Sequence, residues 1–234
     1  SGRSTTLDGR ETASRHVKPQ LFQDDSGQPL KFFDAVVGGR SVGVPGTPAL
    51  MLDAHKRWGK LDWSTLFQSG INLAEVGFKV SPRLSMLVAR DAKHLIRFKR
   101  TSNYFYPDGK PIKVGDILKN LDYAETLRAI AADKGRSFYK GETAKDIVDT
   151  VQSAASNPGL LDLRDLAEYR VKERSAVCIA YHELDVCGMG PPSSGGLTVG
   201  QILGILENYD LAKMGPNSSD AWRLIGDASR LAFA

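Results

Sequence analysis

The stretch MGPPSSGGLTVGQILGILENYD, residues 189–210, places two prolines, two serines and two glycines directly ahead of an apolar helical repeat. The repeat predicts a helix that starts near Gly196 and has one apolar face, formed by Val199, Ile202, Leu203, Ile205 and Leu206. Proline favours an extended approach to the helix, and glycine allows a sharp turn and close packing against a neighbour. This stretch therefore predicts a tight turn that feeds a packed helix.

The two serines of this turn raise the question of chemistry. A serine nucleophile on a strand-to-helix elbow has the pattern G-x-S-x-G, which PPSSGG does not match. We therefore expect Ser193 or Ser194 to cap the helix rather than to attack a substrate. The exposed backbone N–H groups of such a helix start could also meet an anion.

Residues 169–190, immediately before this turn, have the pattern of a β-hairpin. Apolar residues flank a turn at 181–184, which predicts two antiparallel strands and sets Cys178 opposite Cys187. Opposed residues have Cα atoms about 4.5–5.5 Å apart, and a disulfide accepts about 4.4–6.8 Å. The two cysteines are thus either bridged, in an oxidising compartment, or reduced and half-buried.

The rest of the chain has mainly helical patterns separated by turn signals. Thr47 followed by Pro48, and Ser81 followed by Pro82, are typical helix starts, whereas Gly77 is a typical helix end. Together with the few strand-like segments, these patterns predict an α/β (α+β) fold that is predominantly helical.

Composition excludes several functional classes. The net charge of +4 is mild, and neither a nucleic-acid-binding signature nor an apolar run long enough for a membrane span is present. The four histidines stand at no zinc-ligand spacing, and no phosphate-binding or dinucleotide-binding motif appears, so we expect no metal and no cofactor. One basic run, KHLIRFKR at 93–100, is either the solvated face of a helix or a surface for an anionic partner.

The two ends of the sequence lack the usual boundary signals. The segment holds no initiator methionine and no signal peptide, and the apolar helical pattern near residue 234 has no cap after it. We therefore expect residues 1–234 to be a single domain piece of a longer protein, truncated at both ends.

Six motifs, in order from about Thr5 to the end, resemble the large subunit of the gamma-glutamyltransferases. The motifs are LDGRETA, GVPGTPALMLDAHKRWGKLDW, LFQSGINLAEVGFKVSPRL, GRSFYKGETAKDIV, LLDLRDLAEYRVKER and PPSSGG with the helix that ends in ILENYDL. The resemblance implies an N-terminal-nucleophile hydrolase with an αββα sandwich. It also implies a proenzyme that cuts itself into a large and a small subunit, which stay together as a heterodimer.

The resemblance further implies an activity. A threonine at the new N-terminus of the small subunit attacks a gamma-glutamyl amide such as that of glutathione, and water or an amine then takes the glutamyl group. That threonine is not in these 234 residues, so the segment itself holds no catalytic residue and is expected to be inactive alone. A periplasmic or extracellular location is implied as well.

One binding residue carries over from the family. Arg10 matches the arginine of the R-E-x-A-P stretch, which grips the alpha-carboxylate of the glutamyl group with its two parallel N–H donors. Ser14 stands where the family usually has proline. The alternative is that Arg10 only pairs with Glu11 or another acid at the surface.

Two other functions remain open from the sequence. A related cephalosporin or glutaryl acylase would use the same arginine for a different acyl group. A non-catalytic helical scaffold would instead use the basic run 93–100 to bind a partner.

Overall fold

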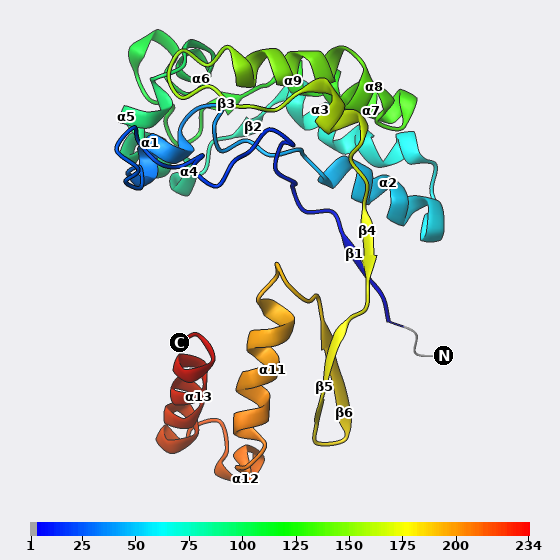
Figure 1. Cartoon of the computed structure of the whole chain (residues 1–234), viewed down its shortest axis with the longest axis vertical. Coiled ribbons are helices and arrows are strands. Elements are labelled where there is room, and N and C mark those ends of the chain that lie inside the picture. Colours follow the sequence, from blue (N-terminus) through cyan, green and yellow to red (C-terminus); the bar gives the residue numbers. More distant parts are fainter. Residues whose placement is uncertain (1–3) are drawn as a thin grey trace. The chain divides into compact units, whose positions relative to one another are not determined.

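The computed structural model describes residues 4–234, and these form two compact units (Figure 1). The first unit consists of the start of the chain and residues 171–234, and the second consists of residues 10–170. Helices outnumber strands, and every sheet among residues 4–234 has two strands, which confirms the predicted α/β class with a helical excess. The expectation that residues 1–234 are a single domain piece of a longer protein stays a prediction.

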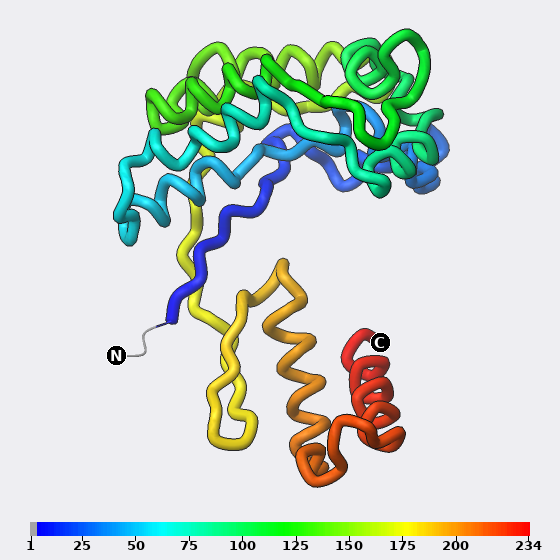
Figure 2. Tube along the Cα trace, turned by 180° about the vertical axis from the view of Figure 1, so that it is seen from behind, coloured from blue at the N-terminus to red at the C-terminus, as the bar shows by residue number. Residues whose placement is uncertain are grey.

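The first unit contains two antiparallel strand pairs and three helices. β1 (Thr6–Asp8) pairs with β4 (Lys172–Arg174), and β5 (Val177–Tyr181) pairs with β6 (Leu184–Gly188). The helices are α11 (Gly195–Leu206), α12 (Leu211–Met214) and α13 (Ser219–Ala232). The β5–β6 hairpin packs against α11, which Figure 2 also shows from behind.

The hairpin has the register that the sequence predicts. Cys178 lies opposite Cys187, and the two residues form a disulfide, so the bridged alternative is confirmed. His182 takes a left-handed conformation (φ 52°) at the turn. Ile179 packs on α11, where a Cβ on Gly200 would lie 3.2 Å from Ile179 Cγ2.

The second unit is built from helices and one short strand pair. The elements from its start to residue 79 are α1 (Phe32–Val36), α2 (Thr47–Trp58), η1 (Trp63–Phe67), α3 (Gln68–Val76) and β2 (Phe78–Lys79). Then follow α4 (Pro82–Arg90), α5 (Ala92–Leu95), α6 (Lys99–Phe105), η2 (Pro107–Gly109), β3 (Ile117–Leu118), α7 (Leu121–Asp133), α8 (Arg136–Lys140), α9 (Glu142–Gln152) and α10 (Leu163–Ala167).

Two apolar clusters form much of the core of the second unit. The first joins α2, η1, α3 and α7, and within it the indole N–H of Trp63 donates to the backbone O of Ile130 at 3.0 Å. The second lies among α4, α5, α6 and the β2–β3 pair, with Val80 and Val88 nearly inaccessible to solvent. The clusters bury the apolar faces of short helices that would not be stable alone.

Several helix boundaries follow the local signals, whereas the start of α2 does not. The hydroxyl of Ser81 accepts from the backbone N–H of Leu84 at 3.1 Å, and Gly77 ends α3 at φ 91°, as expected. Thr47, expected as a cap, is instead the first residue of α2 and makes no capping bond. The reason is tertiary, because a tyrosine from α8 provides the cap, as described below.

Candidate functional site

The backbone around Arg10 is held by residues from distant parts of the sequence. The hydroxyl of Tyr169 donates to the backbone O of Arg10 at 2.8 Å. Thr12, two residues after Arg10, accepts at its backbone O from the N–H of Val44 at 2.8 Å, and the two residues form an isolated β-bridge. These contacts fix the backbone at the base of the arginine side chain.

Tyr169 stacks on a second tyrosine that positions α2. The rings of Tyr169 and Tyr139 are 5.9 Å apart and nearly parallel. The hydroxyl of Tyr139 donates to the backbone O of Pro45 at 2.7 Å and accepts from the backbone N–H of Ala49 at 3.1 Å. Burial of the phenol raises the pKa of Tyr139 to about 12, so it stays a neutral donor. Ala49 is the third residue of α2, so Tyr139 satisfies an N–H group that the helix itself leaves without a partner.

The side chain of Arg10 lies at the surface. Its Nη2 contacts Glu11 Oε1 at 3.4 Å, and the two side chains are 57% and 63% exposed. The alternative pairing with Glu11 is therefore present. An exposed pair at this distance contributes little stability, so an incoming carboxylate could displace Glu11.

Ser14, the departure from the family's proline, has a structural role. The residue is buried, and its hydroxyl donates to the backbone O of Leu160 at 2.9 Å while accepting from the backbone N–H of His16 at 3.2 Å. A proline could do neither, so this chain replaces a rigid ring with two hydrogen bonds.

A buried carboxylate anchors the end of the Arg10 segment. Asp165 Oδ1 accepts from the backbone N–H of Arg15 at 3.0 Å and from its Nε at 3.1 Å. Asp165 and Asp162 also form a reciprocal capping box at the start of α10. Burial raises the pKa of Asp165, but polar contacts with Ser14 and with the N–H groups of Arg15 and Asp162 outweigh it, so the pKa is lowered.

The PPSSGG turn holds no catalytic arrangement. Ser194 occupies the N-cap position of α11, but its hydroxyl makes no capping bond, so the expected cap is wrong in that detail. Its backbone O accepts from the N–H of Thr198 at 2.7 Å. The glycines are needed for packing, because a Cβ on Gly196 would lie 2.6 Å from the backbone O of Met189.

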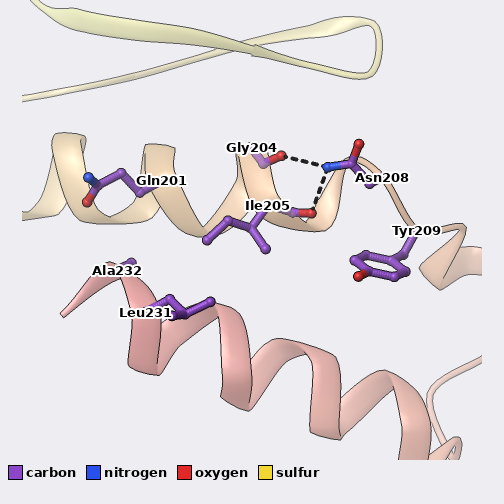
Figure 3. A pocket seen from close by; sticks show the side chains of 7 residues that line it. All are labelled: Gln201, Gly204, Ile205, Asn208, Tyr209, Leu231 and Ala232. Carbon is purple, nitrogen blue, oxygen red and sulfur yellow. Dashed lines mark hydrogen bonds between the residues drawn. The ribbon is translucent and has the colours of Figure 1, made fainter. Parts of the chain in front are cut away.

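A shallow hollow of about 470 Å³ lies between α11 and α13 (Figure 3). Its lining includes Ile205 and Leu231, and the amide of Asn208 is engaged with the carbonyls of Gly204 and Ile205 at 3.4 and 3.2 Å. The lining offers no carboxylate, imidazole or thiol, and Arg10 is not part of it. The residues that line this hollow therefore suggest no catalytic site.

Residues 4–234 contain no group of three or more histidine, cysteine or acidic side chains that could hold a metal ion. Within the same range, no helix has the length and apolar character needed to cross a bilayer.

Sequence reasoning proposed Arg10 as a binding residue, which stays a prediction, and missed the residues that hold its backbone. The spacing of Asp162 and Asp165 has the form of a capping box, which was a usable signal. Nothing local marked Tyr169 or Tyr139, because their partners lie 159 and 94 residues away.

Comparison with known proteins finds one family model and several similar proteins. The family model described as gamma-glutamyltranspeptidase matches residues 1–234. The acylase ACY 1 proenzyme of Pseudomonas sp. strain SE83 is 35% identical, with 100% of this chain and 42% of the relative covered. The glutathione hydrolase proenzyme of Escherichia coli strain K12 is 34% identical, with 100% of this chain and 40% of the relative covered. The chain thus spans about two fifths of these relatives.

Solved structures agree with the family match. The crystal structure of Helicobacter pylori gamma-glutamyltranspeptidase matches with a TM-score of 0.91 and 30% identity, covering 99% of this chain and 66% of that chain. The cephalosporin acylase from Bacillus halodurans matches with a TM-score of 0.81 and 25% identity, covering 98% of this chain and 42% of that chain. These likenesses confirm the fold class that the sequence resemblance implied.

Proposed function

Because the chain belongs to the gamma-glutamyltranspeptidase family, we propose that it is the large-subunit portion of an enzyme that transfers or hydrolyses gamma-glutamyl groups. The match over residues 1–234 carries this proposal. Glutathione and similar gamma-glutamyl compounds are the proposed substrates.

In the proposed reaction this portion binds substrate, and the rest of the precursor supplies the nucleophile. The N-terminal threonine of the small subunit would attack the gamma-amide carbonyl, and its own amine would take the proton. That proton would pass to the substrate amine as its bond to the gamma-carbonyl carbon breaks, which leaves the glutamyl group as an ester on the threonine oxygen. Water or an acceptor amine would then attack this ester and release the glutamyl group. The large and small subunits would remain together as a heterodimer, in line with relatives that are proenzymes.

Arg10 is the proposed ligand of the alpha-carboxylate of the glutamyl group. Its guanidinium is planar and can donate two parallel N–H bonds to one carboxylate. The side chain is 57% exposed, while the backbone below it is fixed by Tyr169. A fixed backbone and an accessible guanidinium are what an arginine needs in order to bind a substrate carboxylate.

The test is Arg10→Lys in the full-length enzyme. Losing a bidentate contact costs about 2–3 kcal/mol, so KM for a gamma-glutamyl substrate should rise about 30- to 150-fold. Arg136→Lys is the matched control, because Arg136 is exposed and lies on α8, away from this segment in sequence. An unchanged KM in Arg10→Lys would remove Arg10 from the site without affecting the family assignment.

A related acylase is the second candidate, favoured by the 35% identity to the ACY 1 proenzyme. Arg10 would then bind the carboxylate of another acyl group, such as glutaryl. Turnover of glutathione against a glutaryl amide by the full-length protein separates the two activities. Faster release from the glutaryl amide would favour the acylase.

The proposed location is periplasmic or extracellular. The Cys178–Cys187 disulfide supports it, because such bridges persist in oxidising compartments. Fractionation of cells that express the full-length protein tests this, and recovery of the protein with cytoplasmic markers would contradict it.

A further inference from the structure

Positive charge is concentrated in one segment of the chain. Residues 79–119 contain ten lysines and arginines against three acidic residues, a net +7. The whole chain carries +4, so all other residues together carry −3. This segment belongs to the second unit and runs from β2 to β3, through α4, α5 and α6.

This charge is poorly compensated within the molecule. Among the salt bridges described for residues 4–234, only Arg90 of these ten basic residues takes part, pairing with Asp91 at 3.2 Å. Lys93 and Arg97 are exposed and make no such pair in that range. Uncompensated positive charge raises the local potential and attracts an anionic partner.

Aromatic side chains lie exposed beside part of this charge. Phe32 and Phe33 of α1 are 70% and 46% exposed. The ring of Phe33 stacks on His94 of α5 with centroids 3.9 Å apart, and Lys93 Nζ lies 5.9 Å from the Phe33 centroid. These contacts place α1 next to α5, as Figure 1 shows.

The helical turn after α5 adds an exposed aliphatic side chain. The backbone N–H of Ile96 donates to Ala92 O, and that of Arg97 donates to His94 O, so the helical path continues to residue 97. Lys93, Ile96 and Arg97 therefore share one side of this turn, and Ile96 is 52% exposed. We call the following residues the basic–aromatic patch: Lys31, Phe32, Phe33, Lys93, Ile96 and Arg97.

We propose that the basic–aromatic patch docks on the surface of a bilayer that contains anionic phospholipids. Lysine and arginine bind the headgroup phosphates. Exposed aromatic rings stabilise the bound state when they leave water and enter the boundary between headgroups and acyl chains. An anionic polymer would satisfy the charges but would leave Phe32 and Ile96 in water. The acids on the same elements, Asp34 and Asp91, reduce the positive excess without removing it, since Arg90 neutralises Asp91.

The docking is separate from substrate chemistry. None of the patch residues contacts the Arg10 segment through a described hydrogen bond or salt bridge. Turnover of a gamma-glutamyl or glutaryl amide in solution should therefore be the same in patch variants and the parent. This activity also serves as the check that each variant is folded.

The test is co-sedimentation of the full-length protein with vesicles of phosphatidylcholine alone and of phosphatidylcholine mixed with phosphatidylglycerol. The parent should bind only the mixed vesicles, with a partition coefficient that falls as salt is raised. Each basic residue near such a surface contributes about fivefold, so Lys31→Gln, Lys93→Gln and Arg97→Gln combined should lose on the order of 100-fold. The matched control combines Lys56→Gln, Lys60→Gln and Lys140→Gln, exposed lysines of the same unit outside the patch.

Phe32→Ser separates bilayer docking from attraction to any polyanion. It should weaken vesicle binding severalfold without changing the salt dependence, because it removes apolar insertion and no charge. The proposal is overturned if the parent binds neither vesicle, or if the patch and control triples lose affinity equally. Unchanged vesicle binding by Phe32→Ser, with dextran sulfate competing fully, would assign the patch to an anionic polymer instead.

Discussion

The β5–β6 hairpin and the Arg10 segment are fixed by contacts of very different sequence range. In the hairpin, every pair lies within 11 residues, and a disulfide with a sequence separation of 9 joins two of them. The Arg10 segment is held by Tyr169, Leu160 and Asp165, which are 146 to 159 residues away. A local pattern can specify the first arrangement, whereas the second exists only when the whole second unit is folded.

The largest expected effect on stability is in the Arg10 segment, which long-range contacts hold. Asp165→Asn removes a buried charge from three hydrogen bonds, those from Arg15 N, Arg15 Nε and Asp162 N. We expect the free energy of unfolding, measured in a denaturant titration, to fall by about 3 kcal/mol. Glu168→Gln is the control, because that side chain is 55% exposed, and it should cost less than about 1 kcal/mol.

Asp165 also predicts a pH dependence. Its pKa is lowered in the folded state, so the unfolded chain binds the proton more readily. The contribution of Asp165 is complete above the pKa of the unfolded carboxyl, about 3.9, and is lost as pH falls through the lower folded pKa. As pH is lowered, the free energy of unfolding should therefore fall less in Asp165→Asn than in the parent. Equal slopes of the free energy of unfolding against pH in the two proteins would contradict this account.

Removing the local restraint should have a smaller and more confined effect. Cys178→Ser with Cys187→Ser opens a short loop, for which we expect a loss of about 2 kcal/mol. Hydrogen exchange should speed up at hairpin and α11 amides, because Ile179 packs on Gly200. Equal loss of protection around Arg10 would show that the two regions are coupled.

Tyr169→Phe probes the support of Arg10 directly. It deletes one hydrogen bond to the Arg10 backbone, so we expect a loss of about 1 kcal/mol in stability. If Tyr169 positions Arg10 for substrate, KM should also rise about fivefold, with kcat unchanged. Tyr139→Phe is the control, since its hydroxyl bonds Pro45 and Ala49 instead and should affect stability alone.

The smallest expected difference concerns two serines at helix starts. Ser81→Ala removes a capping bond to Leu84 N and should cost about 1 kcal/mol. Ser194→Ala should be close to neutral, because the hydroxyl of Ser194 makes no such bond. Thermal unfolding of both variants compares them, and a large loss in Ser194→Ala would reinstate its capping role.

The sequence by itself determined features whose partners are close along the chain. The hairpin register that sets Cys178 opposite Cys187, the cap at Ser81 and the helix end at Gly77 all follow from residue type and spacing within about ten positions, whereas the disulfide itself was one of two open alternatives. The same reasoning correctly placed a helix after PPSSGG. Motif order along the chain also identified the family and selected Arg10 as the candidate ligand.

Only the tertiary structure decided how Arg10 is supported and how helix α2 begins. Tyr139 replaces the cap expected from Thr47, and Ser14 fills the family's proline position with bonds to Leu160 and His16. The bond of Ser14 to His16 is local, but the bonds from Ser14 to Leu160 and from Ala49 to Tyr139 have no local signal, because these hydroxyls meet such partners only after distant segments have packed. Backbone conformation is set largely by near neighbours, but the partners of a buried polar group are set by the packing of the whole unit.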